Sequence, residues 1–186
     1  MALNIRINLE NCYEFNNVSS DLTLSQFVSD LKNGNSAKIG VMIDNERHQF
    51  LPDVFNLSFG PVNDIGQIDD TARLSHENYS KVFSTIVLAS IIFLTKNSNK
   101  YIGIDGSSNA RAYLYFRTIQ NNHDTLTTYF DIYGVNYYVR ILRKDEKDNM
   151  HRINSNDITT IPRAINKGEK INLGELYNYF IFKLKK

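Results

Sequence analysis

The chain passes from strand to helix in one stretch, Tyr101-Ile-Gly-Ile-Asp105-Gly-Ser-Ser-Asn-Ala-Arg111-Ala-Tyr-Leu-Tyr-Phe-Arg117. A short apolar run ends at a small-residue turn, and the helical pattern after it carries Arg111 and Arg117. The start of a helix presents unpaired backbone N–H groups at the positive end of the helix dipole. Together with a nearby guanidinium, these groups can bind an anion. The stretch therefore predicts a strand–turn–helix junction and, at that junction, a candidate anion site.

Composition places the chain among ordinary globular proteins of one domain. Its 186 residues are 42% hydrophobic and 22% charged, which is enough for a core of normal size. With a formal net charge of +1, the protein as a whole has no strong electrostatic attraction to nucleic acid or to an anionic membrane. The single Cys12 excludes an intramolecular disulfide and argues against a cysteine-based zinc site. It fits a reducing, cytoplasmic location.

The first half of the chain is typical of antiparallel β-structure. Residues 4–9 alternate polar and apolar as a half-buried strand does, and residues 38–43 and 54–59 predict two further strands. Residues 22–28 fit either a strand or a short helix. Asp44-Asn45 is expected to turn the chain. These patterns together predict a mainly antiparallel sheet.

Two helices are predicted, over residues 75–95 and 108–121. Ser75 is the expected N-cap of the first, with Glu77 suited to the dipole, and Ser107 is expected to cap the second. The uncharged run 82–94 is too short to span a bilayer and holds serine and threonine, so it predicts a buried helix and no membrane association.

The last third of the sequence is less regular. Residues 129–132 and 136–142 predict two strands on either side of Gly134. The polar stretch 143–170 is expected to be mostly loop, and residues 173–184 fit a strand or a short helix. The prediction is an α+β fold: one domain with its core at about 22–142, in which a twisted, mainly antiparallel sheet packs against two principal helices. The Asp105–Gly106 junction should lie at an edge or end of that sheet.

The candidate anion site comprises Gly106, Ser107, Ser108, Arg111 and Tyr115. The serine hydroxyls and backbone N–H groups would face the anion, and Arg111 lies about one turn further on the same helix face. A helix cap without any ligand explains the same residues. The stretch has neither the Gly-Lys-Ser/Thr ending of a Walker A loop nor the further glycines of a dinucleotide fingerprint.

Asp69, Asp70, His76 and Arg117 are secondary candidates. The two aspartates, with Asp64, offer carboxylates to a cation, but a solvated loop explains them equally well and no metal site is expected. His76 would act as a base only beside a nucleophile or substrate. The arginines would otherwise lay their stems over tyrosine rings and pair with carboxylates. No cofactor is expected, and no residue is assigned a catalytic role.

Several motifs in order resemble those of a known family. They are Phe55-Asn-Leu-Ser-Phe-Gly60, Ile68-Asp-Asp70, Lys81-Val82 and Gly106-Ser-Ser-Asn-Ala-Arg111-Ala-Tyr-Leu-Tyr115. Across about residues 22–139 the chain resembles a small bacterial family of unknown function, with Asn-Leu-x-Phe-Gly and Gly-Ser-Thr/Ser-x-x-Arg-x-x-Leu-Tyr motifs. The chain departs from that family at Tyr113, where a second arginine is frequent. The resemblance implies a compact α+β domain and brings no activity.

Three classes of function remain open. The favoured one is a binding module that recognises an anionic, phosphate-containing ligand or a small protein partner, in a defence or toxin–antitoxin setting, with a homo-oligomer as another possible assembly. The second is an enzyme acting on a nucleotide or nucleic acid, with Ser107, Arg111, His76 and the Asp69-Asp70 pair in one cleft. The third is a structural or protein-binding domain in which Arg111 is buried and paired. Nucleic-acid binding would use the mixed basic and aromatic runs 137–144 and 182–186, which an amphipathic strand with a basic outer face also explains.

Overall fold

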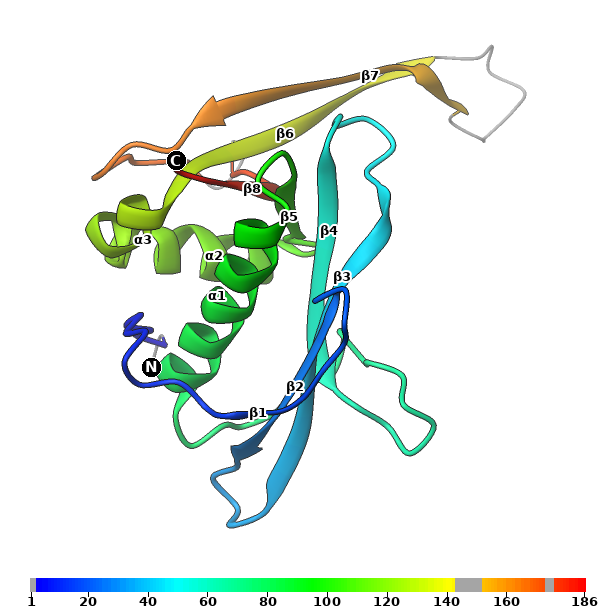
Figure 1. Cartoon of the computed structure of the whole chain (residues 1–186). Coiled ribbons are helices and arrows are strands. Elements are labelled where there is room, and N and C mark those ends of the chain that lie inside the picture. Colours follow the sequence, from blue (N-terminus) through cyan, green and yellow to red (C-terminus); the bar gives the residue numbers. More distant parts are fainter. Residues whose placement is uncertain (1–2, 143–151, 173–175) are drawn as a thin grey trace.

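The computed structural model describes residues 3–142, 152–172 and 176–186 (Figure 1). Within these residues the chain forms eight strands and three helices. In chain order they are β1 (Phe15–Val18), β2 (Leu24–Asp30), β3 (Ser36–Arg47), β4 (Val54–Pro61), α1 (Tyr79–Lys96), β5 (Tyr101–Asp105), α2 (Asn109–Asn121), α3 (His123–Tyr129), β6 (Phe130–Leu142), β7 (Arg152–Ala164) and β8 (Tyr179–Leu184). The predicted α+β fold with two principal helices is confirmed, and α3 is a short third helix.

All eight strands belong to one sheet in the order β1-β2-β3-β4-β5-β8-β6-β7. Figure 1 shows this sheet curving around the three helices, which all lie on one side of it. Every neighbouring pair is antiparallel except β4 and β5, which are parallel and are joined through α1. Because the carboxyl ends of parallel strands point to the same end of a sheet, the loops that follow β4 and β5 come together there.

Helix α1 packs along the sheet as a core helix. Its buried residues include Val82, Ile86, Phe93 and Leu94, which join the main hydrophobic cluster of the sheet. Among the described residues it is the one helix whose length and composition would also suit a membrane span, which by itself is weak support for one. In this fold the apolar face of α1 is covered by strands.

The alternation at residues 4–9 predicts burial correctly but predicts the wrong backbone partner. Ile5 and Ile7 are buried, yet none of the strands in the described residues pairs with this segment. Its backbone N–H groups bond to helix side chains instead: Arg6 to Ser80 Oγ at 2.9 Å and Ile7 to Asn122 Oδ1 at 2.8 Å. Side chains can satisfy buried backbone groups as a neighbouring strand would.

The prediction that Ser75 caps the first helix is wrong. Helix α1 begins after Asn78, whose Oδ1 accepts a hydrogen bond from the Lys81 N–H at 2.9 Å. The preceding residues remain extended because the Ser75 carbonyl accepts from the Lys32 N–H, and the Glu77 N–H donates to the Asp30 carbonyl, both at 2.9 Å. Asparagine and serine are comparable caps, so tertiary bonds decide between them.

Two predicted turns are also wrong. Asp44-Asn45 lies inside β3, where an irregular register between Ile43 and Arg47 absorbs the extra residues. Gly134 lies inside the single strand β6 rather than between two strands. A Cβ at that position would overlap the ring of Tyr177. Gly134 therefore serves the close approach of an aromatic ring and not a turn.

The polar stretch near the C-terminus contains more structure than expected. Residues Arg152–Ala164 form β7, which pairs with β6, so the prediction of a loop across 143–170 is wrong there. Residues 143–151 of that stretch lie outside the described residues. The final segment, left open between strand and helix, is strand β8 between β5 and β6.

Candidate functional site

A cleft of about 690 Å³ opens at the carboxyl ends of β4 and β5. Its walls come from the end of β4, the loop between β4 and α1, the first turns of α1, the end of β5 and the start of α2. The polar and charged side chains that line it are Asn56, Ser58, Asp70, Thr71, Arg73, His76, Tyr79, Asp105, Ser107, Ser108, Arg111 and Tyr115. The cleft thus gathers side chains from segments far apart in the sequence.

Arg111 is held in this cleft by neutral oxygen atoms. One guanidinium nitrogen donates to the Asp70 backbone carbonyl at 2.6 Å, and the other terminal nitrogen donates to Ser107 Oγ at 3.2 Å. In the described parts of the chain, no carboxylate lies within 4.0 Å of the guanidinium. The side chain is therefore oriented while its positive charge is not paired directly.

The helix start beside Arg111 is capped by Ser108 and not by Ser107. The Ser108 backbone is extended, and its Oγ accepts from the Arg111 N–H at 3.3 Å. Ser107, one residue earlier, instead accepts a hydrogen bond on its Oγ from the Arg111 guanidinium. The two serines thus have different roles: Ser108 caps the start of the helix, and Ser107 orients the arginine.

Ser108→Ala is expected to lower the free energy of unfolding by about 1 kcal/mol, because the helix loses its side-chain cap. Ser107→Ala is the matched control and should change stability by less than half as much, since Ser107 is equally exposed but does not cap the helix. Urea unfolding of the two variants measures the difference. An equal loss in both would contradict the assignment of the cap.

The other predicted site residues divide into two groups. Asp70 and His76 line the cleft together with Ser107, Ser108, Arg111 and Tyr115. Asp69, Gly106 and Arg117 do not line it. Gly106 is buried against the first turn of α2, where a Cβ would lie 2.7 Å from Ala112 Cα.

The Asp69 carboxylate closes its own turn instead of facing the cleft. It accepts from the Thr71 N–H at 2.9 Å and from Thr71 Oγ1 at 2.6 Å. These hydrogen bonds, and to a smaller extent the charge of Arg111, lower the pKa of Asp69. The turn fixes the backbone of the next residue, Asp70, whose carbonyl holds Arg111.

Burial shifts the proton affinities of several groups around the cleft. It raises the pKa of Tyr115 to about 12, so the phenol stays protonated, and no group among the described residues bonds to its hydroxyl. Burial also lowers the pKa of His76, whose Nδ1 lies 2.8 Å from Ser29 Oγ. Loss of water raises the pKa of Asp105, and the nearby Arg111 opposes that rise. At neutral pH the cleft therefore offers a neutral imidazole and a neutral phenol.

Gly60 makes room for the loop that carries Asp70. It is the last residue of the Asn56–Gly60 motif, and a Cβ there would overlap the backbone carbonyl of Asp69. The end of β4 and the turn at Asp69 are thus in direct backbone contact. Through this contact the Asn56–Gly60 motif supports the Asp70 carbonyl, which orients Arg111 of the Gly106–Tyr115 motif.

Sequence reasoning missed two charged residues of the cleft. Arg73 lines it from the same loop as Asp70, and Asp105 lines it from the end of β5. The position of Asp105 just before the small-residue turn was the available signal, because strand ends carry functional side chains. In residues 3–142, 152–172 and 176–186, no three His, Cys, Asp or Glu side chains gather in a way that could hold a metal ion.

Comparison with known families matches residues 9–154 to one described as "Family of unknown function (DUF6934)". The chain belongs to the DUF6934 family. The expected resemblance to a family of unknown function is thereby confirmed. No curated protein and no solved structure matches the chain significantly.

The DUF6934 match contains almost every element of the cleft. It spans the Asn56–Gly60 and Gly106–Tyr115 motifs and the loop between β4 and α1. Strand β8, which pairs with β5 beneath the junction, lies beyond the matched residues. The cleft is therefore built from the part of the chain that the DUF6934 family shares.

Proposed function

We propose that the protein is a binding module whose cleft takes a small anionic ligand, a phosphate or a carboxylate, at Arg111. The observation that carries this proposal is the state of the guanidinium. It lies on a 690 Å³ cleft and is fixed by a carbonyl and a hydroxyl rather than by a carboxylate. An arginine has five N–H donors in a planar fork, so donors remain for a ligand.

The other charges of the cleft shape the kind of anion that fits. Among the described residues, two arginines and two aspartates line it: Arg73, Arg111, Asp70 and Asp105. The formal charges cancel, so the cleft does not attract anions as a broad basic patch does. Binding depends on hydrogen bonds to Arg111 and its neighbours, which favours a compact anionic group over a long polyanion.

Arg111→Ala is expected to weaken the binding of phosphate monoesters at least ten-fold, since hydrogen bonds to a charged group contribute about 1.5–3 kcal/mol. Arg117→Ala is the matched control, because Arg117 lies on the same helix but not on the cleft. Calorimetric titration with inorganic phosphate, phenyl phosphate and nucleoside monophosphates measures the effect. Absence of binding by every compound would contradict the proposal.

A second candidate, an enzyme acting on phosphate esters, draws on the position of His76 and Asp70 in the same cleft. His76 Nδ1 and Ser29 Oγ share a hydrogen bond, and in the tautomer in which Nδ1 carries the proton the other ring nitrogen of the neutral imidazole can act as a base. The titrations above distinguish this function, because an enzyme would release inorganic phosphate from the esters. Loss of that release in His76→Gln, with ester binding retained, would establish the enzyme.

A small protein partner would use the same arginine. An aspartate or glutamate of the partner has the anionic group that Arg111 is placed to receive. We consider this partner in an intracellular toxin–antitoxin or defence setting. Phosphate would then compete with the partner for binding in the cleft. The free thiol of Cys12 is in keeping with that reducing location.

A further inference from the structure

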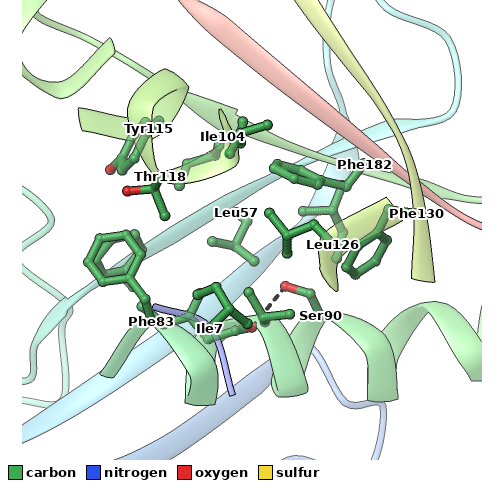
Figure 2. A pocket seen from close by; sticks show the side chains of 15 residues that line it. Ile7, Leu57, Phe83, Ser90, Ile104, Tyr115, Thr118, Leu126, Phe130 and Phe182 are labelled. Atoms are coloured by element: carbon green, nitrogen blue, oxygen red, sulfur yellow. Dashed lines mark hydrogen bonds between the residues drawn. The ribbon is translucent and has the colours of Figure 1, made fainter. Parts of the chain in front are cut away.

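An apolar cavity lies in the core next to the cleft. Its volume is about 80 Å³, and Figure 2 shows side chains from the sheet and the helices lining it. Three of its lining residues carry a hydroxyl group, Ser90, Tyr115 and Thr118, and the other twelve are apolar. The Ser90 hydroxyl donates to the Ile86 carbonyl within its own helix at 2.9 Å, the bond drawn in Figure 2. The cavity is therefore suited to hydrocarbon and not to a polar group.

The cavity and the cleft share a wall. Five residues line both: Leu57, Phe59, Phe83, Ile104 and Tyr115. Tyr115 follows Arg111 by four residues on α2, so the two side chains lie one above the other on one helix face. The rise between them is about 6 Å along the helix. A molecule bound at Arg111 would thus have apolar space within a few bonds of its charged group.

From this arrangement we infer that the ligand is an amphiphilic anion, with its charged group at Arg111 and a short aliphatic chain that passes Tyr115 into the cavity. The inference rests on the proposed function, because it describes the apolar part of the same ligand whose anionic group binds Arg111. The size of the cavity limits the chain. A dry cavity of about 150 Å³ is known to accept benzene, so 80 Å³ suits a chain of a few carbons and not an aromatic ring.

A series of monoalkyl phosphates, from methyl to octyl, tests the inference by calorimetric titration. Affinity is expected to rise about four-fold with each methylene that becomes buried, and to level off once the cavity is filled. Arg111→Ala should weaken all members of the series by a similar factor. Inorganic phosphate gives the affinity of the anionic group alone.

Ser90→Leu fills the cavity and is expected to remove the dependence on chain length while leaving the affinity for inorganic phosphate unchanged. Thr95→Leu is its matched control. Thr95 lies on the same helix, and its hydroxyl also donates to the carbonyl four residues earlier, but its side chain is exposed and outside the cavity. The control should keep the full dependence on chain length.

The possible outcomes separate the two proposals. Equal affinity for every chain length in the natural protein would overturn the amphiphilic ligand and leave anion binding at Arg111 standing. A chain-length dependence that survives in Ser90→Leu would place the chain outside the cavity and would also overturn the inference. No binding by any phosphate would overturn both. If Ser90→Leu does not fold, the series on the natural protein still decides whether a chain is recognised.

Discussion

Gly60→Ala is expected to lower the free energy of unfolding by about 3 kcal/mol and to abolish measurable anion binding at Arg111. The added Cβ would overlap the Asp69 carbonyl, which is backbone and cannot rotate away as a flexible side chain does. The loop must therefore move. Its movement displaces the Asp70 carbonyl that holds the guanidinium. Thermal unfolding and phosphate titration of one sample measure both effects.

Ser58→Ala provides the control for Gly60→Ala. Ser58 lies two residues earlier on β4, is partly buried and also lines the cleft. Its replacement should change stability and phosphate affinity only slightly. A Gly60→Ala protein with the stability and affinity of the natural protein would show that the loop does not rest on this strand.

Asn122→Leu is expected to cost about 3 kcal/mol of stability, because one buried side chain supplies three hydrogen bonds. Its Oδ1 accepts from the Ile7 N–H, and its Nδ2 donates to the carbonyls of Ile5 and Thr118. The side chain fastens the N-terminal segment to the helices. Loss of these bonds should also expose the segment to proteases. Urea unfolding and limited proteolysis measure the two effects.

Asn121→Leu is the neighbouring control. The hydrogen bond between the Arg6 guanidinium and Asn121 uses the backbone carbonyl, at 2.9 Å, and therefore survives the substitution. The control should stay within about 0.5 kcal/mol of the natural protein. A comparable loss of stability in both variants would mean that the effect comes from crowding at the end of α2 and not from the lost hydrogen bonds to the N-terminal segment.

Local patterns predicted the elements whose signals are contained within a few residues. The junction at Asp105–Gly106, the strand predicted over residues 54–59 and the core face of α2 all follow from periodicity and turn chemistry, although β4 continues through Pro61. The apolar alternation around Ile5 and Ile7 likewise predicted their burial. Such signals need no knowledge of distant residues.

The errors occurred where a distant residue decides between two local choices. Asn78 rather than Ser75 caps α1 because bonds to β2 hold the intervening residues extended. Gly134 stands in a strand because the ring of Tyr177, 43 positions later, covers it. For the cleft, the sequence indicated Arg111 and its two serines, but the role of Gly60 depends on a backbone contact that no local pattern reveals.

Strand β8 gives the sheet a particular order of assembly. It is the last strand in the sequence, yet it lies between β5 and β6. Until it is inserted, both of those strands present open edges, and β5 cannot be joined to the β6–β7 hairpin. Residues that pair across β5 and β8, such as Ile104 and Phe180, are far apart in sequence. Pairing β8 with β5 therefore costs loop entropy, and we expect this step of folding to be slow. The sheet beside β5 is thus completed only after β8 has been synthesised, and exposed edges make the preceding interval the one most open to aggregation.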